Sequence, residues 1–491
     1  MATTSPAPEQ SLSPTLTAWE VIPAWRFTAM YAVLLLCIPT RLIVGPIGAP
    51  GTPANLFAMV GLVWWICSIA GGLNPRRGIT PTRLSFGLFT AAVLISYAAG
   101  QIQGWYQPAD IHQRSDRLWQ AANVAQVTET IGSAADRGLL AWAGWAGIVL
   151  LTAEGIRSWR ELEKVISWVV GAGTFMATIG VIQYFTRWNI AGLLQIPGLT
   201  ALTDFGNALS RSTLNRIVST SAHPIELGVV MATILPLALH RSLHSDRKST
   251  WIPTLLIGLA ALMSVSRSAI VVAAVALVIL FLGWPMRWRL IALALVPVAG
   301  VLGPIALPGL LGTLRSLFTG IEHDPSITGR TDDYELVFRM FSERPLFGQG
   351  LFTWVPMVYR TIDNQALVLL LELGIVGLAA FAWLILSGLI QALAPLRTGG
   401  SAQQRHLGLA VAAALIGITT SYVTFDAMGF RQVAGLTFLM LGLAGAVWHI
   451  SQDSRDTGLA VLPVPTPAQP RRRLAEAFQR GDRVPPQSVH Q

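Results

Sequence analysis

Residues 365–390 have the sequence QALVLLLELGIVGLAAFAWLILSGLI, in which Glu372 is the only charged side chain. A helix needs about 20 mostly apolar residues to cross the hydrocarbon core of a bilayer. This stretch is long and apolar enough to do so, and it predicts a transmembrane helix.

The composition of the whole chain agrees with that prediction. Of 491 residues, 53% are hydrophobic and only 12% are charged, whereas a soluble protein has about 25% charged residues. The polar surface is too small to cover a water-exposed globule, so apolar side chains are expected to face lipid. The net charge of +9 comes almost entirely from arginine in short loops and tails. This placement fits membrane topology, and we expect no nucleic-acid partner.

Similar apolar stretches recur along the chain. They lie at 26–45, 55–72, 84–102, 138–155, 165–184, 225–240, 251–266, 268–284, 290–310, 365–390, 407–424 and 433–450. We therefore predict an all-α polytopic membrane protein with about 12 transmembrane helices. Cys37 and Cys67 lie inside apolar stretches and indicate neither a disulfide framework nor a metal site.

The basic residues orient these helices. With the N-terminus in the cytoplasm, every short cytoplasmic connection is basic, with Arg76-Arg77-Arg83, Arg157-Arg160-Lys164, Arg241-Arg247-Lys248, Arg287-Arg289 and Arg397-Arg405. This is the distribution that the positive-inside rule requires. It divides the chain into a disordered cytoplasmic tail at 1–25, a membrane domain at 26–450 and a basic, proline-rich cytoplasmic tail at 451–491. Three long connections, 103–137, 185–224 and 311–364, then lie outside.

The connection 311–364 is predicted to contain an amphipathic helix. In TGRTDDYELVFRMFSERP, the apolar residues Tyr334, Val337, Phe338 and Phe341 follow helical spacing. Acidic residues favour the start of a helix, and Pro345 marks its end. We expect this helix to lie along the outer membrane face.

Arginines at the outer ends of helices are the first candidate site residues. Arg267 lies between two long apolar stretches, and Arg216 precedes another, with Arg211 in reserve. A guanidinium can bind phosphate oxygens by paired hydrogen bonds. The structural alternative for Arg267 is a tight outer turn from which the side chain reaches the interface.

Polar residues before two helices complete the candidates. His223 precedes Pro224, which suits a first helical turn, and Glu226 enters the same helix. Asp363 and Asn364 stand just before residue 365. Both are good N-cap residues, so capping is the structural alternative to a role in the site.

Together, these motifs resemble the signature of the O-antigen ligase and polymerase family. The chain has Gly329-Arg330, then Pro345-Leu346-Phe347-Gly348-Gln349-Gly350, then Asp363-Asn364, then Glu372-Leu373-Gly374-Ile375-Val376-Gly377-Leu378. The SRSA segment at 266–269 and the stretch from Arg216 to His223-Pro224 fit the same order, and the resemblance covers about 140–450. Ligases of this family commonly have His before the Asn. Asp363 at that position weakens the assignment to lipopolysaccharide ligation and leaves polymerase or other ligase roles open.

The resemblance implies a GT-C-like, metal-independent glycosyltransferase in the cytoplasmic membrane of a bacterium. It implies transfer of a glycan from a polyprenyl-diphosphate carrier to a glycan or lipid acceptor on the extracytoplasmic side, with no cofactor. On this view Arg216, Arg267 and Arg330 bind the diphosphate. Asp363 is the first candidate for the general base and His223 the second, and attack opposite the diphosphate inverts the sugar. Arg211, Glu226 and Asn364 are possible supporting residues.

Two other functions stay open at this point. One is a peptidoglycan polymerase of the shape, elongation, division and sporulation type, which shares the lipid-linked donor. The other is a transporter or lipid-glycan flippase, which needs charges and helix breaks near the bilayer midplane.

Overall fold

The protein is described here from a computed structural model. The structure describes residues 23–72, 78–104, 124–202, 210–211, 214–306, 325–356, 358–359 and 361–456. The predicted tails lie almost wholly outside these residues. One compact unit ends at Ser451, and the fold and sites below belong to it.

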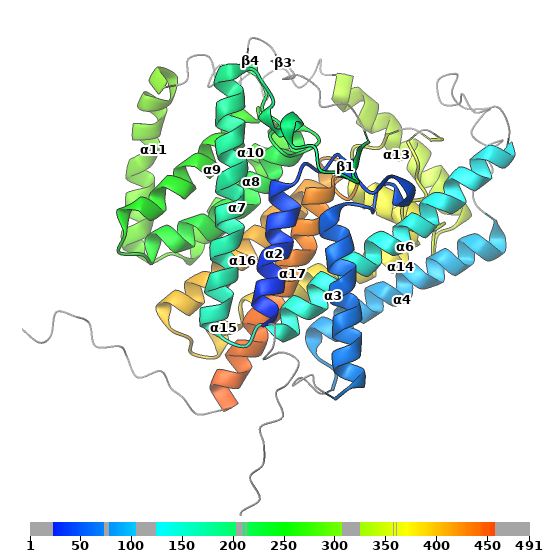
Figure 1. Ribbon diagram of the computed structural model, residues 1–491, viewed down its shortest axis with the longest axis horizontal. Helices are drawn as coiled ribbons and strands as arrows, with labels where there is room; N and C mark the ends of the chain where they lie inside the picture. The colour runs from blue at the N-terminus through cyan, green and yellow to red at the C-terminus, as the bar shows by residue number, and fades with distance from the viewer. Residues whose placement is uncertain are drawn as a thin grey trace, which may run out of the picture. The chain divides into compact units, whose positions relative to one another are not determined.

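The described residues are mainly helical (Figure 1). The helices are α2 (Ala24–Cys37), α3 (Pro53–Ala70), α4 (Pro81–Gln103), α6 (Val124–Gly155), α7 (Trp159–Thr186), α8 (Pro224–Leu243), α9 (Trp251–Met263), α10 (Arg267–Gly283), α11 (Met286–Ala306), α13 (Pro325–Glu343), α14 (Gln365–Ala392), α15 (Ala394–Arg397), α16 (Ala402–Thr420) and α17 (Arg431–Asp456). Among the described residues, the strands form two antiparallel pairs, and each strand has two residues. They are β1 (Leu42–Ile43) with β2 (Thr200–Ala201), and β3 (Ser210–Arg211) with β4 (Leu214–Asn215).

The prediction of a multi-pass helical membrane protein is confirmed. Eight of the described helices are long and apolar enough to cross a membrane, and α2, α9 and α10 are shorter apolar helices. Each of the 12 predicted stretches overlaps a helix. The number of spans stays a prediction, because length and composition do not place a helix in a bilayer.

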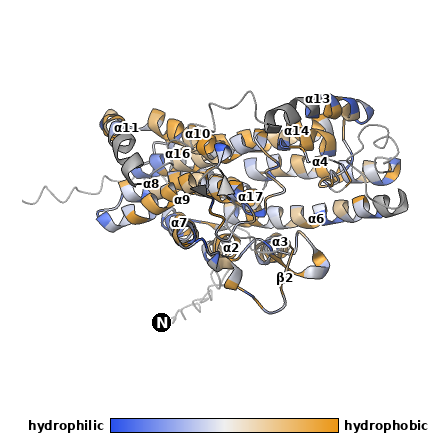
Figure 2. Ribbon diagram, turned by 90° about the horizontal axis from the view of Figure 1, so that it is seen from above, coloured by the Kyte–Doolittle hydropathy of each residue, from blue (hydrophilic) through white to orange (hydrophobic). Residues whose placement is uncertain are grey.

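Burial separates central helices from lipid-facing ones. In α17 the apolar window is 94% buried, whereas in α3 it is 22% buried. The exposed side chains of α3 include Val60, Val63 and Ile66. Figure 2 shows hydrophobic residues along many of the helices, and exposed apolar side chains such as those of α3 are expected where the surrounding solvent is hydrocarbon.

Several helices start where a polar residue precedes proline. Thr52 and Thr80 accept hydrogen bonds from the backbone of Asn55 and Arg83, and proline follows each of them as the first helical residue. His223 does the same for α8, ahead of Pro224. Proline loses nothing at this position because its absent N–H would have no partner in the helix.

Two predicted boundaries were wrong. The first apolar stretch was predicted to continue to residue 45, but α2 ends at Cys37, because Ile38 is extended before Pro39. The connection 103–137 was predicted as a loop, but α6 already begins at Val124. Its first turns carry Glu129, Asp136 and Arg137, so hydropathy alone does not detect them.

The helix predicted in the connection 311–364 is present as α13, and it ends at Glu343, before Pro345. Its apolar residues do not all face inward. Val337 and Met340 are buried, whereas Tyr334 and Phe338 are exposed. α13 packs against α14.

Candidate active site

A cavity of about 510 Å³ lies among the outer ends of α2, α6 and α17, if the termini are cytoplasmic as predicted. Its walls also include segments 49–55, 352–356 and 426–431. Charged side chains in its lining are Arg137, Asp426 and Arg431, and aromatic ones include Trp145, Phe352 and Trp354. The cavity therefore combines a broad apolar surface with a few charges, as small-molecule sites do.

One wall of this cavity depends on a break in α14. Gly374 has φ 64° and ψ −170°, a conformation open essentially to glycine alone, and it divides α14 into two helical parts. The break frees backbone N–H groups that a continuous helix would use. Ile375 N–H donates to the Pro345 carbonyl at 2.9 Å, and Val376 N–H donates to that of Leu346 at 3.2 Å.

The same break exposes the Glu372 carbonyl to the loop. The N–H groups of Gln349 and Gly350 donate to this carbonyl at 3.0 and 2.7 Å. The Glu372 carboxylate accepts from the N–H of Trp354 at 3.0 Å. The two glycine motifs, Pro345 to Gly350 and Glu372 to Gly377, are therefore halves of one unit, here called the loop–helix clamp, which fixes Phe352 and Trp354 in the cavity wall.

A carboxyl group in the cavity lining is affected by the charge of a second carboxyl group. Asp426 lines the cavity, and Asp363 lies near enough for its charge to act on Asp426. Burial, together with the charge of Asp363, raises the pKa of Asp426 to about 6, although Gly429 N–H donates to the carboxylate. The negative charge of one carboxylate makes a second carboxyl group nearby harder to ionise. We call Asp363 and Asp426 the carboxyl pair.

The start of α14 holds this pair in place. Asn364 is the N-cap, since its Oδ1 accepts from the N–H of Ala366 and Leu367, so the capping interpretation is correct for Asn364. The next residue, Gln365, donates its N–H to the Phe425 carbonyl and accepts from Met428 N–H at 2.6 Å. The segment after α16 is thereby fixed against the residues that follow Asp363.

A second corner of the site surrounds His223. Its Nδ1 accepts from Ile225 N–H at 3.2 Å, so the helix-start interpretation is also correct. Burial lowers the pKa of His223 to about 4, and the positive charges of Arg216 and Arg41 contribute. The imidazole is therefore neutral at pH 7. Arg41 donates to the Ala222 carbonyl at 2.6 Å, immediately before His223.

Arg216 reaches the turn that carries Arg267. Its Nε donates to the Ser264 carbonyl at 3.1 Å, three residues before Arg267. Val265 in that turn has φ 47°, a left-handed conformation that is costly for a β-branched residue. The structure thus brings together the segments of Arg216 and Arg267 at the start of α10, where Ser266 is the N-cap.

Glu226 anchors the segment between the two corners. Its carboxylate is fully buried and accepts from Ala222 N–H at 2.6 Å and Gln432 N–H at 2.8 Å. Phe430 lies 6.0 Å from the His223 ring and 5.2 Å from that of Phe425. Residues 425–432 therefore connect the carboxyl pair with the His223 corner, while a supporting role of Glu226 in the site stays a prediction.

The side chains of Arg211 and Arg330 lie outside what the structure describes; their backbones belong to β3 and α13. The predictions for these two residues remain predictions.

The sequence analysis missed four charged residues of this region. Arg431 donates to the carbonyls of Thr40 and Ala49, which places it in the cavity wall. Asp426, Arg137 and Arg41 were also not selected. The sequence did contain a signal for Asp426. It is the only acidic residue from 373 to 452, and it lies between two apolar stretches, on the predicted outer side.

Comparison with known families identifies the segment that carries the clamp. Residues 252–382 match the model of the O-antigen ligase family. This segment is therefore similar to the O-antigen ligase family. It extends from α9 into α14 and includes Arg267, Asp363 and the loop–helix clamp. Arg216, His223 and Asp426 lie beyond the matched residues, on helices and loops that pack around the matched segment. No curated protein matches the chain.

Proposed function

We propose that this protein transfers a glycan from a polyprenyl-diphosphate carrier to a glycan or lipid acceptor, at the outer face of the cytoplasmic membrane of a bacterium. Both termini are cytoplasmic, about 12 helices cross the membrane, and the architecture is GT-C-like. The observation that carries the proposal is segment 425–432, which joins the carboxyl pair and the arginine-rich corner around His223.

The carboxyl pair is the base in this proposal. The acceptor hydroxyl gives its proton to the pair while its oxygen bonds to the anomeric carbon. The bond from this carbon to the diphosphate breaks, and its electron pair leaves with the diphosphate. A pKa near 6 for Asp426 is close to the operating pH, where a general base is most effective. Attack from the side opposite the diphosphate inverts the anomeric centre.

The arginines stabilise the departing diphosphate. Arg216 and Arg267 converge on one turn, and Arg330 is the third candidate. Negative charge grows on the leaving group in the transition state, and guanidinium groups fixed beforehand stabilise it without reorganisation. They supply positive charge that a divalent ion brings in other glycosyltransferases, so the transfer is expected to be independent of added metal.

His223 is the weaker candidate for the base. With a pKa of about 4 its imidazole accepts a proton only reluctantly. Its Nδ1 accepts from Ile225 N–H, so the neutral ring has its proton on Nε2 and can instead donate a hydrogen bond to the donor sugar.

The cavity suits the acceptor in this scheme. Trp145, Phe352 and Trp354 offer aromatic faces to the apolar faces of sugar rings, and Arg137 and Arg431 stand among them as hydrogen-bond donors.

Purified full-length protein in liposomes tests the proposal. A polyprenyl-diphosphate oligosaccharide is added with a lipid or glycan acceptor, and the product is separated by mass. We expect transfer by the wild type and by the control variant Arg397→Ala, which removes an exposed arginine. We expect no transfer by Arg267→Ala, although this variant is folded and inserted in the liposomes. Undiminished transfer by Arg267→Ala would overturn the role of the arginines.

A further inference from the structure

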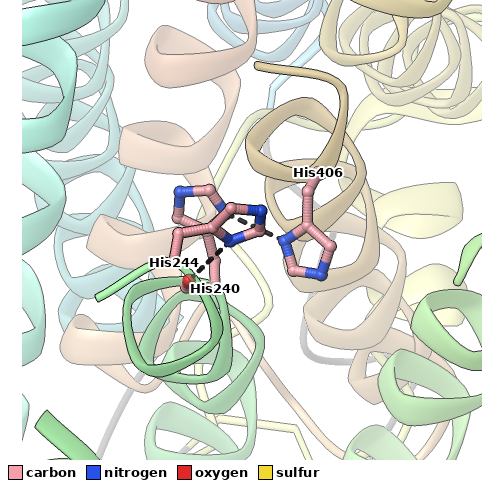
Figure 3. Close-up of side chains that lie close together, drawn as sticks. All are labelled: His240, His244 and His406. Carbon is pink, nitrogen blue, oxygen red and sulfur yellow. Dashed lines mark hydrogen bonds between the residues drawn. The ribbon is translucent and has the colours of Figure 1, made fainter. Parts of the chain in front are cut away.

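Three histidines meet at the end of α8 opposite His223. His240 lies in the last turn of α8, His244 is its C-cap, and His406 lies in the second turn of α16. The three ring centroids are 4.8 to 5.1 Å apart. Figure 3 shows the rings of His240 and His244 from one helix turned toward His406 on the other. Residues i and i+4 share a helix face, so the pair on α8 is directed to one point.

Hydrogen bonds determine which nitrogen of each ring carries the proton. Trp284 Nε1–H donates to His406 Nε2 at 2.8 Å, so the proton of the neutral His406 ring is on Nδ1. This Nδ1–H donates to His240 Nδ1 at 2.8 Å. His240 then donates from Nε2 to the Glu163 carboxylate at 3.0 Å. Every hydrogen bond in this series, from Trp284 to Glu163, therefore has one donor and one acceptor.

The arrangement around His240 is that of a metal ligand. Its Nδ1 has a lone pair, directed at the other rings, while its Nε2–H is held by a carboxylate. A carboxylate in this position orients a ligating imidazole and makes it more basic. Gln403 in turn donates to the same Glu163 oxygen at 3.1 Å.

His244 supplies a third nitrogen. Its Nδ1 is directed to the His240 carbonyl at 3.0 Å, which leaves Nε2 as the acceptor of this ring. One ligand atom from each histidine lies within 4.8 Å of the others. In a tetrahedral zinc site with Zn–N bonds of 2.0–2.1 Å, ligand nitrogens are about 3.3 Å apart. The rings reach that spacing by shifts of about 1 Å or less.

We propose that His240, His244 and His406 bind a divalent first-row transition-metal ion, Zn²⁺ first among them, with water in the fourth position. Imidazole nitrogens favour zinc, copper and nickel over magnesium and calcium, whose ligands are oxygens. His240 is buried and His406 half-buried, whereas His244 is exposed, which gives the ion a path from solvent.

Binding of the ion competes with two existing hydrogen bonds, the one between His406 Nδ1 and His240 Nδ1 and the one from Trp284 to His406 Nε2. Ligation through His406 Nδ1 moves the ring proton to Nε2, where it faces the Trp284 N–H, another donor. The indole of Trp284 therefore has to turn away, so His406 has different hydrogen-bond partners in the metal-free and metal-bound states. Trp284 therefore lowers the affinity of the site, and its removal is expected to strengthen binding.

The ion would act away from the transfer chemistry. His240 is 17 residues from His223, or about 25 Å along α8 at 1.5 Å per residue. The three ligands and Glu163 belong to α7, α8 and α16. The bound ion would fasten the inner ends of these helices, under the predicted topology, and so stabilise the platform that holds the outer site.

Zinc titration of the full-length protein tests this inference. The protein is purified in detergent without a histidine tag, treated with a chelator, and titrated with Zn²⁺ in a calorimeter. We expect one tight site per chain in the wild type and in His223→Ala, a matched change at the other end of α8. His244→Ala should lose tight binding, and because His244 is exposed its removal spares the packed interior.

The variant Trp284→Phe provides a second test in the same Zn²⁺ titration. It removes one hydrogen bond that opposes ligation, so Zn²⁺ should bind severalfold more tightly than in the wild type. Zn²⁺ should also raise the Tm of the wild type and Trp284→Phe but not that of His244→Ala. No tight site in the wild type, or equal binding by His244→Ala, would overturn the inference and leave a hydrogen-bonded histidine cluster only.

Discussion

Replacing Gly374 with alanine tests the loop–helix clamp. A Cβ on Gly374 would lie 2.3 Å from the Leu346 oxygen and 2.6 Å from the Phe347 nitrogen, both backbone atoms that cannot rotate away. The φ of 64° with ψ of −170° costs a non-glycine residue about 1–3 kcal/mol. Relief of the clash would open the bonds from Ile375 and Val376, worth about 1 kcal/mol each.

The expected loss is therefore about 3–5 kcal/mol in the free energy of unfolding. Titration of the detergent-solubilised protein with SDS measures it, and the transfer assay should show a parallel loss because the clamp fixes Trp354 in the cavity wall.

Gly171→Ala is the matched control for this substitution. Gly171 lies inside α7 with open space around its Cβ position. Alanine there should stabilise the helix by about 1 kcal/mol or less. If Gly374→Ala unfolded at the same SDS concentration as Gly171→Ala, the clamp would contribute no stability and its account would be wrong.

Three further predictions concern the charged residues. Transfer by the wild type should rise as the pH passes through about 6, the pKa at which Asp426 loses its proton, and Asp426→Asn should reduce transfer and abolish that step. An unchanged pH profile in Asp426→Asn would exclude Asp426 from the base. The folded pKa of His223, about 4, is below the 6.5 of the unfolded chain, so its contribution to stability is present above pH 6.5 and is lost as the pH falls toward 4. His223→Asn should therefore lose less stability than the wild type between pH 6.5 and 4, as followed by SDS titration, and an identical loss would refute the shift. Glu226→Gln replaces one of two acceptor oxygens by a donor that faces an N–H, which should cost about 1–3 kcal/mol; a variant as stable as the wild type would show that this anchor is dispensable.

The sequence predicted the helices well because each apolar stretch is long and local. The sequence analysis placed the end of α13 before Pro345, where the structure has it, since proline cannot continue a helix. It missed the early start of α6, because the polar turns from Val124 carry no hydropathy signal.

The site was less predictable because its contacts join distant segments. The sequence analysis identified the motif that contains Gly348 and Gly350. It did not predict that the Glu372 carbonyl receives two N–H groups there, since this depends on the break at Gly374. Asp426 was overlooked because its role arises from proximity to Asp363, 63 residues earlier.

Transfer by Asp363→Asn is the most direct test of the central claim. The purified variant, the wild type and Asp363→Glu are given the same polyprenyl-diphosphate oligosaccharide and acceptor in the presence of a chelator, and donor binding is measured in parallel. We predict transfer by the wild type, a trace by Asp363→Glu, and none by Asp363→Asn despite unchanged donor binding, because the amide cannot take the hydroxyl proton. Transfer by Asp363→Asn at the rate of the wild type would contradict the assignment of the carboxyl pair as the base.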